Sequence, residues 1–253
     1  MTDTPTPQSG PDNPLIIALD GLDVSRAEAL IRLLTPHVWG FKFNDALHDR
    51  ELDTLYAAAG DEARLFIDCK LHDIPNTVAN TIRRICARRI PQLITVHASG
   101  GPAMMSAAVR AADEASNGRT AVLAVTVLTS LDDETCRAVY GALPPGQVST
   151  LAQIAALSGC HGMVCSPHEL NIARRVGLRA VVPGIRPAWY QDHDGNGHRG
   201  DDQSRVATAR SAMADGATSL VIGRPIVHAP DPLHAVQRTL DEIRHAVQSE
   251  PRN

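Results

Sequence analysis

The sequence predicts an α/β protein with the (β/α)8 architecture of a TIM barrel, built as a single domain. Three observations lead to this fold. Short apolar runs rich in Val, Ile and Leu recur without strict alternation, as strands of a helix-covered parallel sheet do. A pattern typical of an amphipathic helix follows each run. Between Asp20 and Gly223, which end the first and the eighth run, the spacing averages about 29 residues, the length of one strand–helix unit.

The eight expected strands are Leu15–Asp20, Val38–Phe43, Arg64–Cys69, Gln92–His97, Ala121–Val127, Gly162–Cys165, Arg179–Val182 and Ser219–Gly223. Helix starts are marked between them. Ser25 to Glu28 reads as a capping box, and Ser166 to Glu169 repeats it with a proline at the first helical position. Asp231 and Pro232 open the last helix. A doubly wound open sheet is the competing architecture, but no G-x-G-x-x-G follows the first strand.

The domain boundaries follow from composition. We expect one barrel domain over residues 14–248, because 253 residues suffice for one large domain or two small ones. Residues 1–13 are polar and Pro-rich without the apolar stretch of a signal peptide, which predicts a disordered tail. Residues 249–253 are expected to fray. The polar, Gly-rich segment at about 184–203 is long for a connection and predicts a functional lid.

Composition excludes several classes of protein. The net charge of −4 argues against a nucleic-acid surface, and no apolar run approaches the roughly 18 residues that a membrane span needs. The five cysteines are an odd number without a C-x-x-C pair. They fit a reduced, cytoplasmic protein better than a disulfide scaffold.

Charged residues gather at the predicted strand ends. In a barrel of this type the chemistry lies at the carboxyl ends of the strands, where Asp20, Lys42, Asp68 and Lys70 are expected. Only Lys42 and Lys70 are lysines among the 24 basic residues, and both fall at this end. One such charge could simply face solvent, but the set together predicts an active site.

The densest of these segments runs from Asp68 to Thr77. Residues two apart on a strand point the same way, so Asp68 and Lys70 should face the barrel mouth while Cys69 faces the helices. Asp73 follows on the turn and Thr77 one helical turn later. An ammonium between carboxylates stays protonated, which suits a general acid that protonates a carbanion. The alternative is a structural salt bridge at a strand end.

A phosphate site is expected where the seventh and eighth strands end. Gly223 lets the backbone approach an oxyanion, and Arg224 can bind it through paired hydrogen bonds. Arg186 stands at the base of the predicted lid, which ends near Gln203. Residues 192–197 match the first half of an EF-hand loop, but Gln203 replaces its bidentate glutamate, so no metal site is expected.

These residues resemble the orotidine 5′-phosphate decarboxylase family, of the bacterial type. The most specific element is Asp68-Cys-Lys70-Leu-His-Asp73-Ile-Pro-Asn-Thr77, which matches the D-x-K-x-H-D-I-P-N-T signature of the family. The further matching segments, in order, are Leu15–Asp20, Thr95–Gly101, Val125–Ser130, Pro183–Pro187, Asp202-Gln203 and Val221–Pro225. The resemblance therefore covers nearly the whole chain.

The resemblance implies conversion of orotidine monophosphate to UMP in pyrimidine synthesis, with neither cofactor nor metal. It places Lys42, Asp68, Lys70 and Asp73 in an alternating charged tetrad in which Lys70 protonates C6 of the pyrimidine. The further substrate-binding positions that it implies are Asp20 and Thr77 for the ribose, Thr129 and Ser130 for the pyrimidine, Arg186, Gly223 and Arg224 for the phosphate, and Gln203 between base and phosphate. It also implies a homodimer in which Asp73 and Thr77 enter the neighbouring subunit's site.

One departure and two alternatives remain open. After Lys42 the family usually continues Val-Gly, whereas this chain has Phe43-Asn44-Asp45, so the second-strand loop is uncertain. Related sugar-phosphate decarboxylases share a D-x-K-x-x-D pattern but use magnesium. The H-D-I-P-N-T continuation and the long lid favour a nucleotide. A catalytically silent nucleotide-binding barrel is the second alternative, against which the intact Asp68, Lys70 and Asp73 argue.

Overall fold

Eight parallel strands close into a barrel in the computed structural model, which describes residues 13–44, 52–191 and 206–247. Each strand pairs with the next along the chain, and the last pairs with the first, so the predicted TIM-barrel fold is confirmed. The strands are β1 (Leu15–Ala18), β2 (Gly40–Phe43), β3 (Arg64–Leu71), β4 (Leu93–His97), β5 (Ala121–Val125), β6 (Gly162–Val164), β7 (Arg179–Val182) and β8 (Ser219–Ile222). All eight expected strands are present, with small shifts at their ends.

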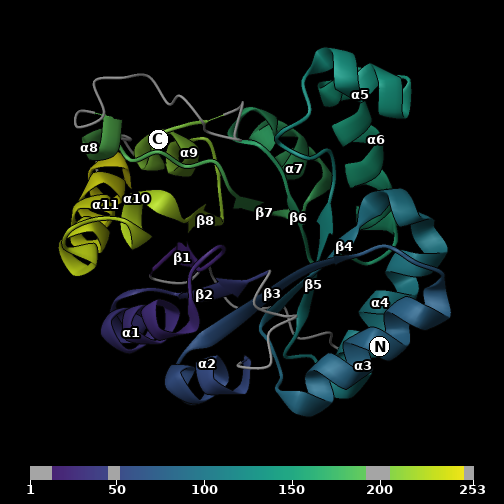
Figure 1. Ribbon diagram of the computed structural model, residues 1–253. Helices are drawn as coiled ribbons and strands as arrows, with labels where there is room; N and C mark the ends of the chain where they lie inside the picture. The colour runs from purple at the N-terminus through teal and green to yellow at the C-terminus, as the bar shows by residue number, and fades with distance from the viewer. Residues whose placement is uncertain (1–12, 45–51, 192–205, 248–253) are drawn as a thin grey trace.

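Helices surround the strands on all sides (Figure 1). The α-helices are α1 (Val24–Leu34), α2 (Leu52–Ala59), α3 (Pro75–Arg88), α4 (Gly101–Ser116), α5 (Asp133–Tyr140), α6 (Pro144–Leu157), α7 (Leu170–Val176), α8 (Ala188–Gln191), α9 (Ala209–Ala214), α10 (Arg224–Val227) and α11 (Pro232–Val247). Short 3-10 helices are η1 (Thr35–His37), η3 (Ala98–Gly100) and η4 (Pro167–Glu169). None of the described helices is long and apolar enough to cross a membrane.

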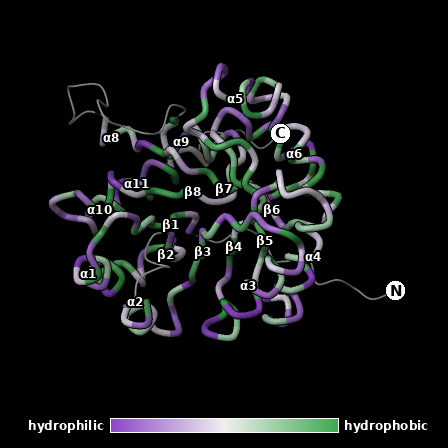
Figure 2. Tube along the Cα trace, turned by 45° about the vertical axis from the view of Figure 1, so that its right-hand side comes forward, coloured by the Kyte–Doolittle hydropathy of each residue, from purple (hydrophilic) through white to green (hydrophobic). Residues whose placement is uncertain are grey.

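Two apolar layers hold the barrel together. The larger lies between strands and helices, where the helices turn residues such as Leu30, Ile31 and Val236 inward. The smaller fills the barrel interior with side chains that include Ile16, Phe66 and Leu123. The central strands are accordingly hydrophobic, while the helices alternate hydrophobic and hydrophilic stretches (Figure 2). Because side chains fill the interior of the barrel, a functional site can form only at the carboxyl ends of its strands.

The helix starts agree with two of the three predicted signals. Asp231 accepts a hydrogen bond from the backbone N–H of His234 at the start of α11, and Glu169 accepts one from the N–H of Ser166. The prediction of a capping box at Ser25 is wrong. Asp23 caps α1 by accepting from the N–H of Arg26, so Ser25 already lies within the first turn.

The third strand contains the irregularity that shapes the site. Ile67 pairs with Ile94 and Leu71 pairs with Val96, so three residues of β3 stand opposite the single residue Thr95 of β4. Lys70 lies in this bulge with φ = 44°, a left-handed conformation that non-glycine residues rarely adopt. Regular strand alternation predicts that Asp68 and Lys70 lie on the same side of the strand. Both do line the same cavity, but the strand between them is bulged and not regular.

Glycine is required where β2 meets β3. A Cβ atom at Gly40 would lie 2.2 Å from the carbonyl oxygen of Arg64, closer than real Cβ atoms come to any neighbour. Gly162 in β6 approaches Arg179 of β7 in a similar way, at 2.8 Å. These two contacts lie at the amino-terminal parts of their strands, so they serve barrel closure and not the site.

The loop after β7 is anchored at both of its described ends. Ile185 and Ala207 form an isolated parallel bridge, and the N–H of Arg186 donates to the carbonyl of Ala207 at 2.8 Å. Glu242 of α11 accepts from the N–H of Ala188 at 2.9 Å and from the N–H of Arg210 at 3.1 Å. One carboxylate thus joins the first turns of α8 and α9, which flank residues 192–205.

Candidate active site

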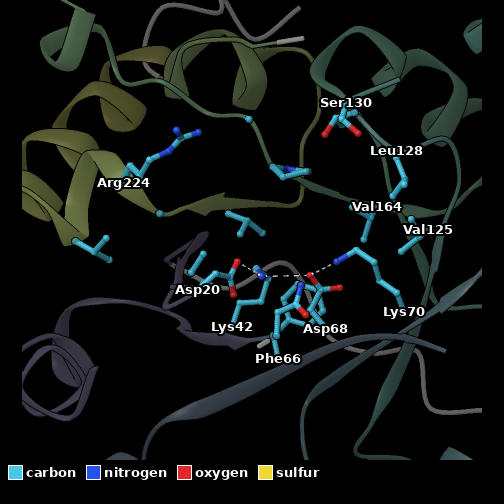
Figure 3. A pocket seen from close by; sticks show the side chains of 18 of the residues that line it. Asp20, Lys42, Phe66, Asp68, Lys70, Val125, Leu128, Ser130, Val164 and Arg224 are labelled. Atoms are coloured by element: carbon cyan, nitrogen blue, oxygen red, sulfur yellow. Dashed lines mark hydrogen bonds and ion pairs between the residues drawn. The ribbon is translucent and has the colours of Figure 1, made fainter. Parts of the chain in front are cut away.

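A cavity of about 580 Å³ opens at the carboxyl ends of the strands. Phe66, Val125 and Val164 contribute apolar surface, and charged side chains project from two sides (Figure 3). Its position is the one that strand order predicts, because the side chains at the ends of eight parallel strands converge there. The volume lies within the range of small-molecule sites.

Four alternating charges form a row across one side of the cavity. The Nζ of Lys42 lies 2.6 Å from Oδ2 of Asp20 and 3.2 Å from Oδ2 of Asp68. The Nζ of Lys70 lies 2.7 Å from the same Asp68 oxygen. The row therefore runs Asp20, Lys42, Asp68, Lys70, as the dashed lines in Figure 3 show.

Burial differs along this row and separates the two lysines. The side chain of Lys42 is 8% exposed, whereas that of Lys70 is 30% exposed and projects toward the open part of the cavity. Lys42 is therefore held between two carboxylates. Lys70 is held on one side by Asp68 and can reach a bound molecule on the other.

The pKa values of the inner pair reflect their mutual attraction. Burial alone would lower the pKa of Lys42, but Asp68 and Asp20 bring it above its ordinary 10.5. Burial alone would raise the pKa of Asp68, but Lys42, Lys70 and a hydrogen bond from Thr95 hold it below its ordinary 3.8. Both groups are charged at neutral pH.

Thr95 is a site residue that sequence reasoning did not single out. Its side chain is fully buried, and Oγ1 donates to Oδ1 of Asp68 at 2.9 Å while accepting from the N–H of Lys70 at 2.9 Å. The sequence carried one available signal. Thr95 is a hydroxyl residue two positions before the end of the fourth strand, and that strand neighbours the third strand, which carries Asp68 and Lys70. Without the bulge in β3, nothing indicated that this hydroxyl meets the lysine backbone.

The other walls carry the remaining predicted residues. Thr129 and Ser130, after β5, line one wall beside Leu128, which belongs to the same predicted segment but was not given a role. Gly223 and Arg224, at the end of β8, line another wall together with Arg186, which is 5% exposed. In Figure 3 Arg224 stands across the cavity from Lys70 and Ser130. Arg224 thus lies apart from the end of the charged row at Lys70.

Two predicted site residues in the described part of the chain are not brought into this cavity. Asp73 and Thr77 are exposed and do not line it, and Asp73 accepts a hydrogen bond from the N–H of Ile74 at 2.6 Å. Gln203 lies outside the described residues, as does the partial calcium motif at 192–197. Asn44, where the chain departs from the family pattern, lines the cavity.

The described residues hold no cluster of three or more His, Cys, Asp or Glu side chains that could bind a metal ion. His72 and His97 come near each other, with ring centroids 5.6 Å apart. Desolvation, with smaller contributions from His72 and Lys70, lowers the pKa of His97. The charged side chains that line the cavity are two carboxylates, two ammonium groups and two guanidinium groups.

Known proteins are similar to this chain in sequence and in fold. Orotidine 5′-phosphate decarboxylase from Paramagnetospirillum magneticum is 43% identical over 245 residues, covering 91% of this chain and 98% of that protein. The enzyme of the same name from Thermobifida fusca is also 43% identical, covering 91% and 96%. The crystal structure of orotidine 5′-phosphate decarboxylase from Lactobacillus acidophilus superposes with a TM-score of 0.73 at 31% identity, covering 92% of this chain and 99% of that one.

The family comparison extends over most of the barrel. Residues 13–239 match the orotidine 5′-phosphate decarboxylase / HUMPS family. This range includes every predicted site residue, from Asp20 in the loop after β1 to Arg224 at the start of α10. The chain belongs to the orotidine 5′-phosphate decarboxylase / HUMPS family.

Proposed function

We propose that this protein decarboxylates orotidine 5′-phosphate to UMP and carbon dioxide, with Lys70 donating the proton to C6 of the pyrimidine. The observation that carries the proposal is the row of alternating charges, which ends in a half-buried lysine facing the cavity. The names of the curated relatives support the substrate and place the reaction in pyrimidine biosynthesis. Family membership makes the chain a carboxy-lyase.

The proposed step needs no cofactor or metal. The bond between C6 and the carboxylate carbon breaks, carbon dioxide leaves, and the electron pair stays on C6. The Nζ of Lys70 gives its proton to that pair, forming the C6–H bond, and the neutral amine regains a proton from water. Stabilisation then comes from charges that are already in position, which is the effective way to favour a charged transition state over the substrate.

Asp68 has two roles in this scheme. It holds the ammonium of Lys70 at 2.7 Å and stays ionised because its pKa is lowered. Its negative charge is also proposed to crowd the substrate carboxylate, an unfavourable contact that disappears as carbon dioxide leaves. Asp20, at the other end of the row, is proposed to bind the ribose hydroxyls together with Thr77, and Lys42 is proposed to contact the substrate beside Asp20.

Phosphate binding supplies the energy that offsets this crowding. Arg186, Gly223 and Arg224 are proposed to bind the phosphate, and Gln203 to bridge phosphate and base. Thr129 and Ser130 are proposed to bind the pyrimidine. The phosphate is remote from C6, so energy gained there can be used at the reacting carbon.

A homodimer with shared sites accounts for the two residues that stay outside the cavity. We propose that Asp73 and Thr77 enter the site of a partner subunit. We also propose that the enzyme is cytoplasmic and that residues 14–248 form the single domain of each copy. In support, both side chains are exposed, and the neighbouring Ile74 is an apolar side chain that is 66% exposed. Pairing of two copies would cover that surface.

The direct test is carbon dioxide release from orotidine 5′-phosphate by the purified protein. Lys70→Ala should abolish turnover while UMP still binds, and Lys70→Arg should also fail because a guanidinium holds its proton too tightly. Equal loss of UMP affinity and turnover would assign Lys70 to substrate binding instead. An assay with EDTA separates this reaction from that of magnesium-dependent sugar-phosphate decarboxylases.

The shared site is tested with two inactive variants, Lys70→Ala and Asp73→Asn. In a mixed dimer one site receives both defects and the other receives neither, so random exchange returns activity to about a quarter of all sites. The variants are unfolded and refolded together, and mixed dimers are counted by mass spectrometry. No recovery in the presence of mixed dimers would rule out the sharing.

A further inference from the structure

The hydroxyl of Thr95 touches the charged row without lining the cavity. It lies on β4, opposite the bulge of β3, and its side chain is fully buried. The three residues of the bulge all contact Thr95. Its hydroxyl donates to Asp68 and accepts from the N–H of Lys70, and its carbonyl accepts from Sγ of Cys69 at 3.7 Å.

The bulge creates the need for such a group. Three residues of β3 face one residue of β4, so the regular ladder cannot satisfy every backbone donor there. A buried N–H without a partner is costly, and the hydroxyl of Thr95 supplies the acceptor for Lys70. The same residue has φ = 44°, a conformation that persists only where its surroundings enforce it.

The hydroxyl also orients the carboxylate. A threonine hydroxyl has one proton to donate. Because the ionised carboxylate of Asp68 can only accept, that proton goes to its Oδ1, while the hydroxyl oxygen accepts from the N–H of Lys70. Oδ2 is then left for both ammonium groups, at 2.7 Å from Lys70 and 3.2 Å from Lys42. One hydroxyl therefore fixes the backbone of the proton donor and the plane of its counter-ion.

We propose that Thr95 is a positioning residue of the decarboxylation, which sets the direction of the Lys70 ammonium through the bulge and through Asp68. The inference rests on the proposed function, since it concerns the reach of Lys70 toward the reacting carbon. It predicts a separation of effects. Loss of the Thr95 hydroxyl changes the position of the Lys70 ammonium, whereas Arg186 and Arg224, on other walls of the cavity, still bind the phosphate.

The test compares Thr95→Val, Thr95→Ser and Thr120→Val with the unchanged protein. Valine matches threonine in shape but lacks the hydroxyl, whereas serine keeps it. We expect Thr95→Val to lower kcat by roughly 10- to 100-fold, the range for one lost hydrogen bond to a charged group. Affinity for UMP should change by less than about threefold, and Thr95→Ser should restore most of kcat.

Thr120→Val is the matched control. Thr120 is also buried, but it precedes β5 at the other end of the barrel and donates to the carbonyl of Pro91. Loss of the Thr120 hydroxyl should lower the free energy of unfolding and leave kcat unchanged. Melting with saturating UMP shows whether each variant is folded, and Thr95→Ala replaces Thr95→Val if the latter is not.

Two results would overturn the proposal. Thr95→Val or Thr95→Ala with kcat close to that of Thr95→Ser would show that the hydroxyl does not position Lys70. A loss of UMP affinity equal to the loss of kcat would make Thr95 a general structural residue. If the unchanged protein itself released no carbon dioxide, the proposed function would fail instead, so the two failures are distinguishable.

Discussion

Glu242 provides a quantitative test of how the loop after β7 is held in place. Its carboxylate is half-buried on α11 and accepts from the N–H groups of Ala188 and Arg210, at 2.9 Å and 3.1 Å. Glu242→Ala removes both acceptors at once. Each bond contributes about 1 kcal/mol net, as helix-capping bonds do, so the expected loss is about 2 kcal/mol in the free energy of unfolding.

The assay is thermal unfolding combined with UMP binding. A protein of this size loses roughly 2–4 °C of Tm for each kcal/mol, so Glu242→Ala should melt about 4–8 °C lower. Arg186 lies at the first of the two anchored ends, with its N–H bonded to the carbonyl of Ala207. We therefore also expect calorimetry to show UMP binding weakened by about three- to tenfold, because the Arg186 side chain is less firmly placed.

Asp241→Ala is the matched control on the same helix. Asp241 pairs with Arg244 at 2.6 Å, but both side chains are more than half exposed. Such surface pairs contribute little, so this variant should stay within about 0.5 kcal/mol of the parent protein. If Glu242→Ala and Asp241→Ala have the same Tm, the two hydrogen bonds of Glu242 do not hold the loop and the reasoning is refuted.

Three further predictions concern the site and the barrel. Arg224→Ala should raise KM and lower kcat/KM by about 10- to 100-fold while hardly affecting a substrate without phosphate; equal loss on both substrates would contradict a phosphate contact. Because the pKa of Asp68 is lowered on folding, its contribution to stability is intact above about pH 5 and is lost only as the pH falls below about 4. Melting curves of Asp68→Asn should therefore show a flatter decline in acid, and an unchanged decline would refute this. Gly40→Ala should destabilise by more than about 3 kcal/mol in urea unfolding, whereas Gly146→Ala, in a helix with open space around it, should be neutral or stabilising; similar values for both would refute the steric argument.

The barrel and most of its site could be predicted from the sequence because periodicity and strand ends are local signals. The strands were recognisable as apolar runs, and placing Lys42, Asp68 and Lys70 at their carboxyl ends required only the fold. The residues that escaped prediction depend on geometry between strands. Thr95 became visible only when the register shift between β3 and β4 was known.

Helix starts show the same limit at a smaller scale. Ser25 and Asp23 are both good capping residues two positions apart, and propensity does not choose between them. The structure places the first helical residue at Val24, which leaves Asp23 as the cap. The exposed positions of Asp73 and Thr77 could not be read from their spacing either, because the turn after β3 carries them away from their own cavity.

The scarcity of lysine in this chain has a practical consequence for chemical labelling. The only two lysines are the two in the charged row, and their side chains differ in exposure, 30% for Lys70 and 8% for Lys42. The only side chains that an amine-directed reagent can label are therefore these two lysines of the cavity. We expect it to label Lys70 before Lys42. A lysine-specific protease has just these two sites to cut, both at strand ends inside the barrel mouth, so cleavage requires the barrel to open. Digestion by that enzyme measures global unfolding against a background free of surface cuts.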